Sequence, residues 1–220
     1  MENSHTYFGF YFSLIILFLY KAMGCEPIDT TLGFTSQPLN QSKFIIQKPY
    51  DIPVEQRYNF SDGVHTLRVI KTDKPHTRLC KTEPRTEIRI HGYDYCSGVW
   101  QFEAYGYVPC GTSGVCIMQV FGSKPPHATT AMLKIHNTSL YYYSDEVIIS
   151  NLYNKWFRLN VIHDVEGNNV KVYIDGVLKH DGPARGGTSH YFKCGVYSQT
   201  DASFYMESRW KDITIFNKHA

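Results

Sequence analysis

Beyond residue 25, apolar and polar side chains alternate in short segments, and no long stretch has the 3.6-residue period of a helix. Asp175-Gly176 is a strong signal for a two-residue turn between strands. Many short strands separated by turns predict an all-β fold, an antiparallel β-sandwich of the jelly-roll type. The pattern predicts strands at 99–108, 158–165, 170–174 and 209–216, and short helical turns only at 39–44 and 146–151.

Composition supports one folded domain, expected over residues 40–217 after a lead segment at 25–39. The chain of 220 residues is 43% hydrophobic and 15% aromatic, which is enough for a full core and excludes intrinsic disorder. Lys and Arg number 22 against 20 Asp and Glu, a formal net charge of +2. This balance does not predict a nucleic-acid partner or a polybasic membrane patch.

The N-terminus has the pattern of a secretory signal peptide. Residues 7–20 are almost continuously apolar, but these 14 residues are shorter than the roughly 20 that a spanning helix needs. Ala22 and Gly24 then place small residues where a signal peptidase reads them. We therefore predict a signal peptide at 1–24, with an uncleaved anchor as the alternative. The expected location is the secretory pathway, then the vacuole or the extracellular space and cell wall, without stable membrane association after cleavage.

Glycosylation sequons and cysteines fit that route. Three sequons begin at Asn40, Asn59 and Asn137. Six cysteines permit up to three disulfides, or plain buried thiols in a domain of this size. No C-x-x-C or paired-histidine spacing is present, so neither a metal nor another cofactor is expected. Nothing in the pattern requires an oligomer, and a monomer is expected.

One predicted strand carries charge on a single face. Side chains of a strand alternate between its faces, so in residues 84–90 Arg85, Glu87 and Arg89 stand together, opposite Ile88 and Ile90. A glutamate between two arginines can hold both guanidinium groups, and arginine presents a bidentate fork to a carboxylate. This strand therefore indicates a site for an anion.

Two further segments place polar groups on one face. In 116–121, Gln119 shares a face with Ile117 and Phe121, and in 191–199 the polar face is opposite a core-facing set that includes Cys194. If the three strands are neighbours in one sheet, their polar faces merge into a cleft floor with a net charge of +2. The alternative is three ordinary solvated strand faces. The expected floor consists of Arg85, Glu87, Arg89, Gln119, Lys193, Tyr197 and Gln199.

These segments resemble the motifs of a known enzyme family. Arg85-Thr-Glu-Ile-Arg89 is similar to the R-[ST]-E-[LV]-R motif of the alginate lyases of polysaccharide lyase family seven. Tyr191-Phe-Lys-Cys-Gly-Val-Tyr-Ser-Gln199 resembles the family's Y-F-K-A-G-x-Y-x-Q motif. Gln119-Val-Phe121 resembles its Q-[IV]-H motif without the histidine. Segments 46–51, 62–65 and 72–76 are similar to the plant citrate-binding proteins, a branch of the same superfamily.

The resemblance implies a jelly roll with a concave binding sheet and roles for its motif residues. In the lyases an arginine and a glutamine neutralise a uronate carboxylate, a histidine or tyrosine removes the adjacent proton, and the tyrosine protonates the leaving oxygen. Arg85 and Gln119 would then be the neutralising pair and Tyr197 the acid and base. The supporting residues of the cleft would be Glu87, Arg89, Lys193 and Gln199.

Phe121 decides how much of this chemistry carries over. Phenylalanine can neither accept nor donate a proton, and loss of one positioned proton-transfer group commonly costs about 10²–10⁴-fold in rate. Tyr197 could serve as both base and acid only if Arg89 and Lys193 lower its pKa, which is normally ~10. His91 shares the parity of Arg85 but is better interpreted as a surface residue at a strand end.

Other histidines and aromatic residues have simpler interpretations. Surface or loop positions are expected for His65, His76, His127, His136, His163, His180, His190 and His219. The run 141–143 of three tyrosines either stacks on sugar rings or edges the sandwich, and the second is commoner. Trp100, Trp156 and Trp210 are expected in the core.

Taken together, the sequence favours a binding protein for a small carboxylate or an acidic glycan: citrate, a related polycarboxylate or a uronate unit. The alternative is a polysaccharide lyase that performs β-elimination with Tyr197 as its proton shuttle. A third interpretation is a structural protein with a vestigial cleft.

Overall fold

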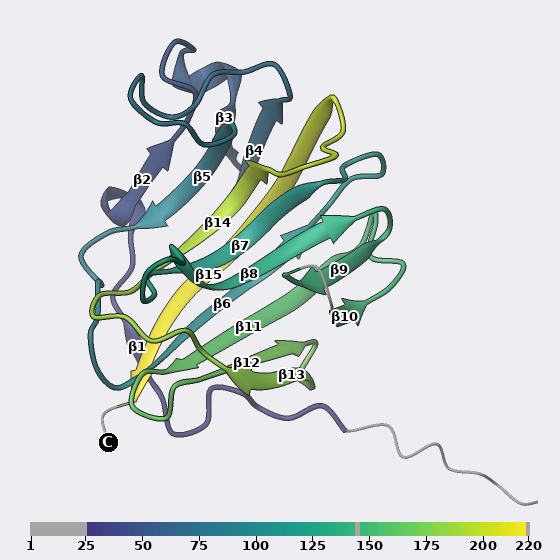
Figure 1. The fold of residues 1–220 in the computed structure, drawn as a ribbon. Coiled ribbons are helices and arrows are strands. Elements are labelled where there is room, and N and C mark those ends of the chain that lie inside the picture. Colours follow the sequence, from purple (N-terminus) through teal and green to yellow (C-terminus); the bar gives the residue numbers. More distant parts are fainter. Residues whose placement is uncertain (1–25, 144–145, 219–220) are drawn as a thin grey trace, which may run out of the picture.

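Two antiparallel sheets pack face to face in the computed structural model, which describes residues 26–143 and 146–218 (Figure 1). The eight-stranded sheet runs β13 (Val177–Pro183), β12 (Asn169–Ile174), β11 (Trp156–Asp164), β6 (Val99–Tyr107), β15 (Tyr205–Lys218), β4 (Val64–Ile70) and β3 (Tyr58–Ser61), with β1 (Thr35–Gln37) paired to β15. The seven-stranded sheet runs β10 (Glu146–Ile149), β9 (Ser139–Tyr142), β8 (Thr129–His136), β7 (Val115–Phe121), β14 (Tyr191–Ser198), β5 (Arg85–Ile90) and β2 (Phe44–Gln47). The jelly-roll prediction is confirmed.

The strands arise where the sequence alternates. The four strands predicted from alternation are present as β6, β11, β12 and β15, the last longer than expected. The three predicted polar strands are present as β5, β7 and β14. Asp175 and Gly176 both have positive φ, 51° and 81°, which suits the two-residue turn that joins β12 to β13. The helical turn expected at 39–44 is a 3-10 helix, Gln41–Lys43, and a second one forms at Val54–Gln56.

One short element differs from its prediction. The helical turn expected at 146–151 is wrong, because Glu146–Ile149 forms β10 and pairs with β9. Val147 and Ile149 suit a pleated edge strand, and the neighbouring strand supplies the backbone partners that a lone sequence window cannot show.

The core lies between the two sheets and takes one face of each. Phe102 and Ala104 of β6 and Trp210 of β15 are fully buried there, as their parity predicts. Trp100 is only half-buried and packs against this core, stacked on Tyr95. The core placement expected for Trp156 is wrong, since its side chain is 39% exposed on the outer face of β11.

Three histidines also differ from the expectation. His65, His163 and His190 are buried rather than superficial. The hydroxyl of Tyr95 lies 3.0 Å from Nδ1 of His163, and the rings of His163 and His190 meet at 4.6 Å. Tyr95 packs against His163 and His190 from a sequence-distant segment, which spacing along the chain does not reveal. Phe60 of the neighbouring strand packs against His65.

Features of the secretory prediction are described only in part. The predicted signal peptide and Cys25 lie outside the described residues. The other five cysteines have free thiols, with Cys116 and Cys194 buried. Asn40, Asn59 and Asn137 are all exposed, so each sequon is accessible. No helix within the described ranges is long and apolar enough to cross a membrane.

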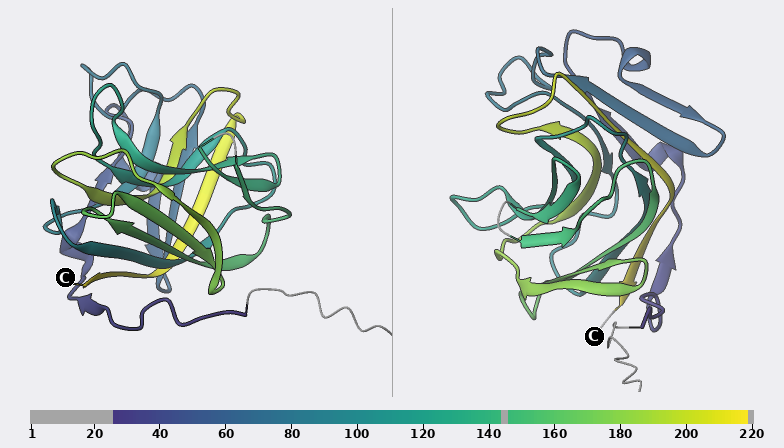
Figure 2. Two further views of the ribbon diagram at one scale, coloured as in Figure 1. Left: turned by 60° about the horizontal axis from the view of Figure 1, so that its bottom comes forward. Right: turned by 90° about the vertical axis from the view of Figure 1, so that its right-hand side faces the viewer.

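The seven-stranded sheet is curved, and its outer face lies on the inside of the curve (Figure 2, right). β14, the strand with the Y-F-K segment, runs through the middle of this sheet, between β7 and β5. The predicted polar faces therefore belong to one layer.

Candidate functional site

The three polar strands are neighbours, as the cleft prediction requires. Lys193 of β14 is in register with Arg89 of β5 on one side and with Gln119 of β7 on the other. Tyr197 is in register with Arg85. The strand order thus brings together side chains that are more than 100 residues apart in the chain.

Glu87 is the centre of the resulting network. Its carboxylate accepts hydrogen bonds from Nζ of Lys193 at 2.5 Å, from Nε2 of Gln119 at 2.5 Å and from Nη1 of Arg85 at 3.2 Å. Arg85 also donates to the hydroxyl of Thr82 at 3.1 Å. One carboxylate therefore fixes the cation, the amide and the guanidinium that the motifs bring to this sheet.

This network is deeper than a solvated cleft floor. Glu87 is fully buried, Lys193 and Gln119 are each 1% exposed, and Arg85 is 6% exposed. Burial lowers the pKa of Lys193, and the charge of Glu87 acts in the opposite direction. Glu87, Lys193 and Gln119 hold the geometry of the site, and Arg85, the most exposed of the four, forms the surface that a ligand meets together with the residues around it.

Tyr197 covers the guanidinium of Arg85. Cζ of Arg85 lies 3.7 Å from the centroid of the Tyr197 ring, a close cation–π contact. Burial raises the pKa of Tyr197, and the charge of Arg85 only partly opposes this. A lowered pKa, the condition for Tyr197 to act as a base, is therefore not met, because half-burial outweighs the neighbouring cation.

Phe121 occupies its own aromatic stack. Its ring lies 4.8 Å from that of Tyr191, and Cζ of Arg89 lies 4.1 Å from the centroid of the same Tyr191 ring. Arg89 also donates to Asp94 at 2.5 Å and contacts Nδ1 of His91 at 3.2 Å. His91 is exposed at the end of β5, as predicted.

Asp94 reduces the charge that was expected here. The predicted floor carries a net +2, but Asp94, in the loop after β5, forms a salt bridge with Arg89. Glu87 is likewise shared by Lys193 and Arg85. With Asp94 included, the net charge is +1, which still favours an anion but is balanced by a smaller negative charge on the ligand.

A bulge in β7 corrects one face assignment. The pairing of β7 with β8 shifts between Cys116 and Met118, and its pairing with β14 shifts at the same level. Ile117 therefore joins the core instead of sharing a face with Gln119, and Cys116 lies in register with Tyr197. A bulge inserts a residue and resets the alternation, which simple parity cannot anticipate.

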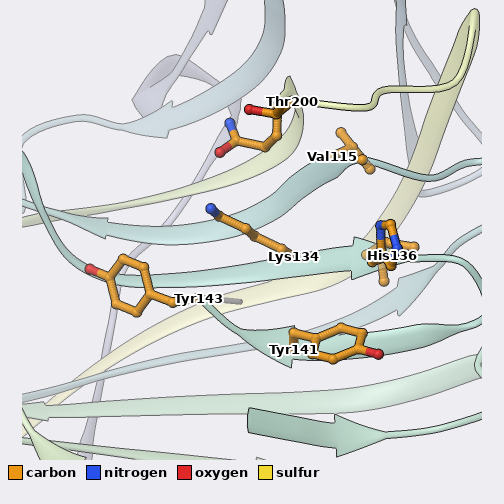
Figure 3. Close-up of a pocket in the computed structure, with 9 residues that line it drawn as sticks. Val115, Lys134, His136, Tyr141, Tyr143 and Thr200 are labelled. Carbon is orange, nitrogen blue, oxygen red and sulfur yellow. The ribbon is translucent and has the colours of Figure 1, made fainter. Parts of the chain in front are cut away.

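A pocket of about 460 Å³ continues the site across β7, β8 and β9. Figure 3 shows the Lys134 side chain extending into it between Tyr143 and the chain near Thr200. Gln199, predicted as a binding residue, lines this pocket, and its amide also donates to its neighbouring carbonyl at Ser198. Tyr141 and Tyr143 line it too, so the tyrosine run contributes to the site as well as to the sheet edge.

One cross-strand row joins the pocket to the buried network. Register places Arg85, Tyr197, Cys116, Lys134 and Tyr141 in line across β5, β14, β7, β8 and β9. Neighbouring strands are about 4.8 Å apart, so Arg85 and Lys134 stand on strands about 14 Å apart. The candidate site is therefore elongated.

His76 was missed by the reasoning from sequence. It lies in the loop between β4 and β5, which fits the expected loop or surface position, but its side chain is partly buried. Burial lowers the pKa of His76, and the charges of Arg85 and Lys193 lower it further. These charges act on His76 because the loop folds back over the network, and only a contact map could have revealed this.

The described part of the chain contains no cluster of three or more His, Cys, Asp or Glu side chains arranged to hold a metal ion. What the site offers is a set of donors and a positive charge. It also lacks a histidine at the end of β7, where the aromatic stack stands instead.

Comparisons with known proteins agree with this architecture. The sequence profile named "Alginate lyase" matches residues 38–217. A citrate-binding protein from Hevea brasiliensis is 47% identical over 223 residues, which cover 98% of this chain and 91% of the relative.

Solved structures share the fold at low identity. The alginate lyase AlgAT5 from polysaccharide lyase family 7 has a TM-score of 0.59 at 18% identity, covering 83% of this chain and 92% of its own. The alginate lyase from Corynebacterium sp. has a TM-score of 0.61 at 17% identity, covering 82% and 91%. The family 7 lyase A1-II′ in complex with its product (GGG) has a TM-score of 0.64 at 13% identity, covering 79% and 94%. The chain therefore belongs to the alginate lyase superfamily, together with the citrate-binding protein of Hevea.

Proposed function

We propose that this protein binds carboxylates at the outer face of its seven-stranded sheet. The ligand is citrate, a related polycarboxylate or the uronate unit of an acidic glycan. The observation that carries the proposal is the network in which Glu87 holds Arg85, Gln119 and Lys193 on one layer, next to a stack in which Phe121 stands where the lyase motif has its histidine. Guanidinium and amide groups are planar donors that suit a carboxylate.

The surroundings of the network support binding rather than turnover. Phe121 cannot accept a proton, and burial raises the pKa of Tyr197. The citrate-binding relative from Hevea supports a small acidic ligand, and the complex of A1-II′ with its product supports an oligosaccharide. Under this proposal the protein acts in the vacuole, the extracellular space or the cell wall, since its N-terminal sequence predicts the secretory pathway, and we expect it to act as a monomer.

Titration calorimetry with citrate and with oligouronates tests the proposal. We expect saturable binding that Arg85→Ala and Arg89→Ala abolish or weaken by more than about tenfold, since each variant removes a charge-assisted donor. Lys179→Ala, at an exposed lysine on β13 of the other sheet, is the control and should bind normally. Unchanged affinity in both Arg85 and Arg89 variants contradicts the assignment.

A lyase remains the second candidate, supported by the close stack of Arg85 on Tyr197 in a chain of this superfamily. Its product is an unsaturated uronate, detected by ultraviolet absorbance with alginate, glucuronan and pectate as substrates. Turnover that Tyr197→Phe abolishes supports the lyase. Absence of product at high protein concentration, together with calorimetric binding, supports the carboxylate-binding function.

A further inference from the structure

The outer face of the eight-stranded sheet carries aromatic rings and cations on β11, β6 and β15, which lie side by side (Figure 1). The register forms one cross-strand row of Trp156, Tyr107 and Arg209. The next row consists of Arg158, Tyr105 and Lys211. Because Ala104, Phe157 and Trp210 on the same strands face the core, both rows face outward. We call these six residues the aromatic–basic patch.

The rings of the patch are exposed although they are large. Trp156 is 39% exposed and Tyr105 is 37% exposed, and the rings of Tyr107 and Trp156 are in contact at 5.4 Å. Exposed aromatic side chains gathered on one face indicate an interaction surface more strongly than isolated ones do. These side chains stand on paired strands rather than on loops, so their backbone positions are fixed by the sheet.

Lys211 supplies the charge at the centre of the patch. Its Nζ lies 4.8 Å from the ring centroid of Trp156 and 5.5 Å from that of Tyr105. Arg209 forms a salt bridge with Glu207 at 2.7 Å, and Arg158 interacts electrostatically with Asp29. Lys211 forms no salt bridge with any carboxylate of the described residues, so the patch keeps a positive charge for a partner.

We propose that the aromatic–basic patch binds a strand of acidic polysaccharide. A pyranose ring presents a C–H face that packs on an aromatic ring, and its carboxylate pairs with a neighbouring ammonium or guanidinium group. Tyr105 and Tyr107 are two residues apart on one strand, about 6.8 Å, which gives successive contacts along an extended chain. This surface lies on the side of the sandwich opposite the carboxylate site.

A membrane is the less suitable partner. Interfacial binding normally buries a continuous apolar face among lipid headgroups. The patch has no aliphatic side chain and contains three cations in six positions. Acidic polysaccharide satisfies both the rings and the charges.

Affinity electrophoresis of the full chain in gels containing polygalacturonate tests the proposal. We expect retardation that Trp156→Ala and Lys211→Ala each weaken by about tenfold in apparent affinity. Lys179→Ala, an exposed lysine on β13, is the matched control and should migrate as the wild type. Trp156→Phe, which keeps a ring, should retain most of the retardation, and circular dichroism and thermal unfolding verify that each variant is folded.

Arg85→Ala separates this surface from the proposed carboxylate site. We expect it to keep its retardation, whereas Lys211→Ala should keep its calorimetric affinity for citrate. Three results overturn the proposal. The first is retardation that only Arg85→Ala abolishes, and the second is a loss of retardation in Lys179→Ala equal to that in Lys211→Ala. The third is equal retardation of the wild type in gels containing neutral hydroxyethyl cellulose. Binding to phosphatidylserine vesicles without retardation by polygalacturonate also overturns it and assigns the patch to membranes.

Discussion

Nζ of Lys193 lies 2.5 Å from the carboxylate of Glu87, and the side chains of the two residues are only 2% and 0% exposed. The pair joins β14 to β5 beneath the face on which we place the ligand. A buried charge is tolerated only when it is paired and hydrogen-bonded, so each partner depends on the other.

Removing the charge of Glu87 should therefore unfold the protein more easily. We expect Glu87→Gln to lower the free energy of unfolding by about 3–5 kcal/mol, because Lys193 and Arg85 then lose their buried counter-charge. Urea denaturation measures this. Asp181→Asn is the control, since it breaks the exposed salt bridge with Lys171 and should cost less than about 1 kcal/mol. An equal loss of unfolding free energy in the two variants would contradict the larger contribution expected of the buried pair.

Acid should destabilise the fold through His163. Burial lowers the pKa of His163 from 6.5 to about 3, with a further contribution from His190. Below pH 6.5 the unfolded chain takes up a proton that the folded chain refuses, so stability falls as pH decreases toward 3. We expect a loss of about 2 kcal/mol from this residue between pH 7 and pH 5.

Urea denaturation of His163→Gln at both pH values checks this. The variant should lose about 2 kcal/mol less than the wild type over this interval. The exposed His91 provides the control, because His91→Gln should keep the wild-type dependence. An identical loss of unfolding free energy from pH 7 to pH 5 in His163→Gln and the wild type contradicts the prediction.

Carboxylate binding should strengthen as pH falls through the range in which His76 takes up a proton. Burial, Arg85 and Lys193 lower the pKa of His76, so an incoming anion that offsets these cations raises that pKa and binds together with a proton. Calorimetry with an oligouronate between pH 7 and pH 5 measures this, because its carboxyl groups remain ionised there. His76→Gln should flatten the dependence, whereas His127→Gln in an exposed loop should not. A flat profile in the wild type would contradict the coupling.

Lys134 should distinguish long ligands from short ones. Its strand lies three strand spacings, about 14 Å, from that of Arg85, which is longer than a citrate molecule. We expect Lys134→Ala to weaken the binding of a uronate tetramer by about tenfold and that of citrate by less than about twofold. Lys179→Ala is the control for loss of a surface charge. An equal loss for both ligands would indicate that Lys134 acts on the overall charge and not at a separate subsite.

The sequence predicted much of the fold because alternation is a local property. The faces of β5 and β14 followed from their period of two, with Ile88 and Cys194 directed into the core. The same logic failed where a neighbouring strand decides the outcome. The bulge in β7 turned the Ile117 side chain to the core face, and pairing with β9 made Glu146–Ile149 a strand.

The candidate site divides in the same way. The identity of the polar groups was readable, since Arg85, Gln119 and Tyr197 stand in short recognisable motifs. Their depth was not, because burial depends on the curvature of a sheet and on loops from distant segments. Asp94 and His76 both reach the site from loops whose spacing carries no signal.

Local side-chain order alone thus dictates which face of each strand is polar and which is apolar, because neighbouring residues on a strand point in opposite directions. Only the packed molecule decides which strands become neighbours, since pairing joins segments such as β5 and β14 that are about a hundred residues apart in the chain. That choice placed Glu87 under Lys193 and gathered the rings of the aromatic–basic patch on the other sheet. Hydrogen bonding across strands and exclusion of water are collective effects, which no single segment contains.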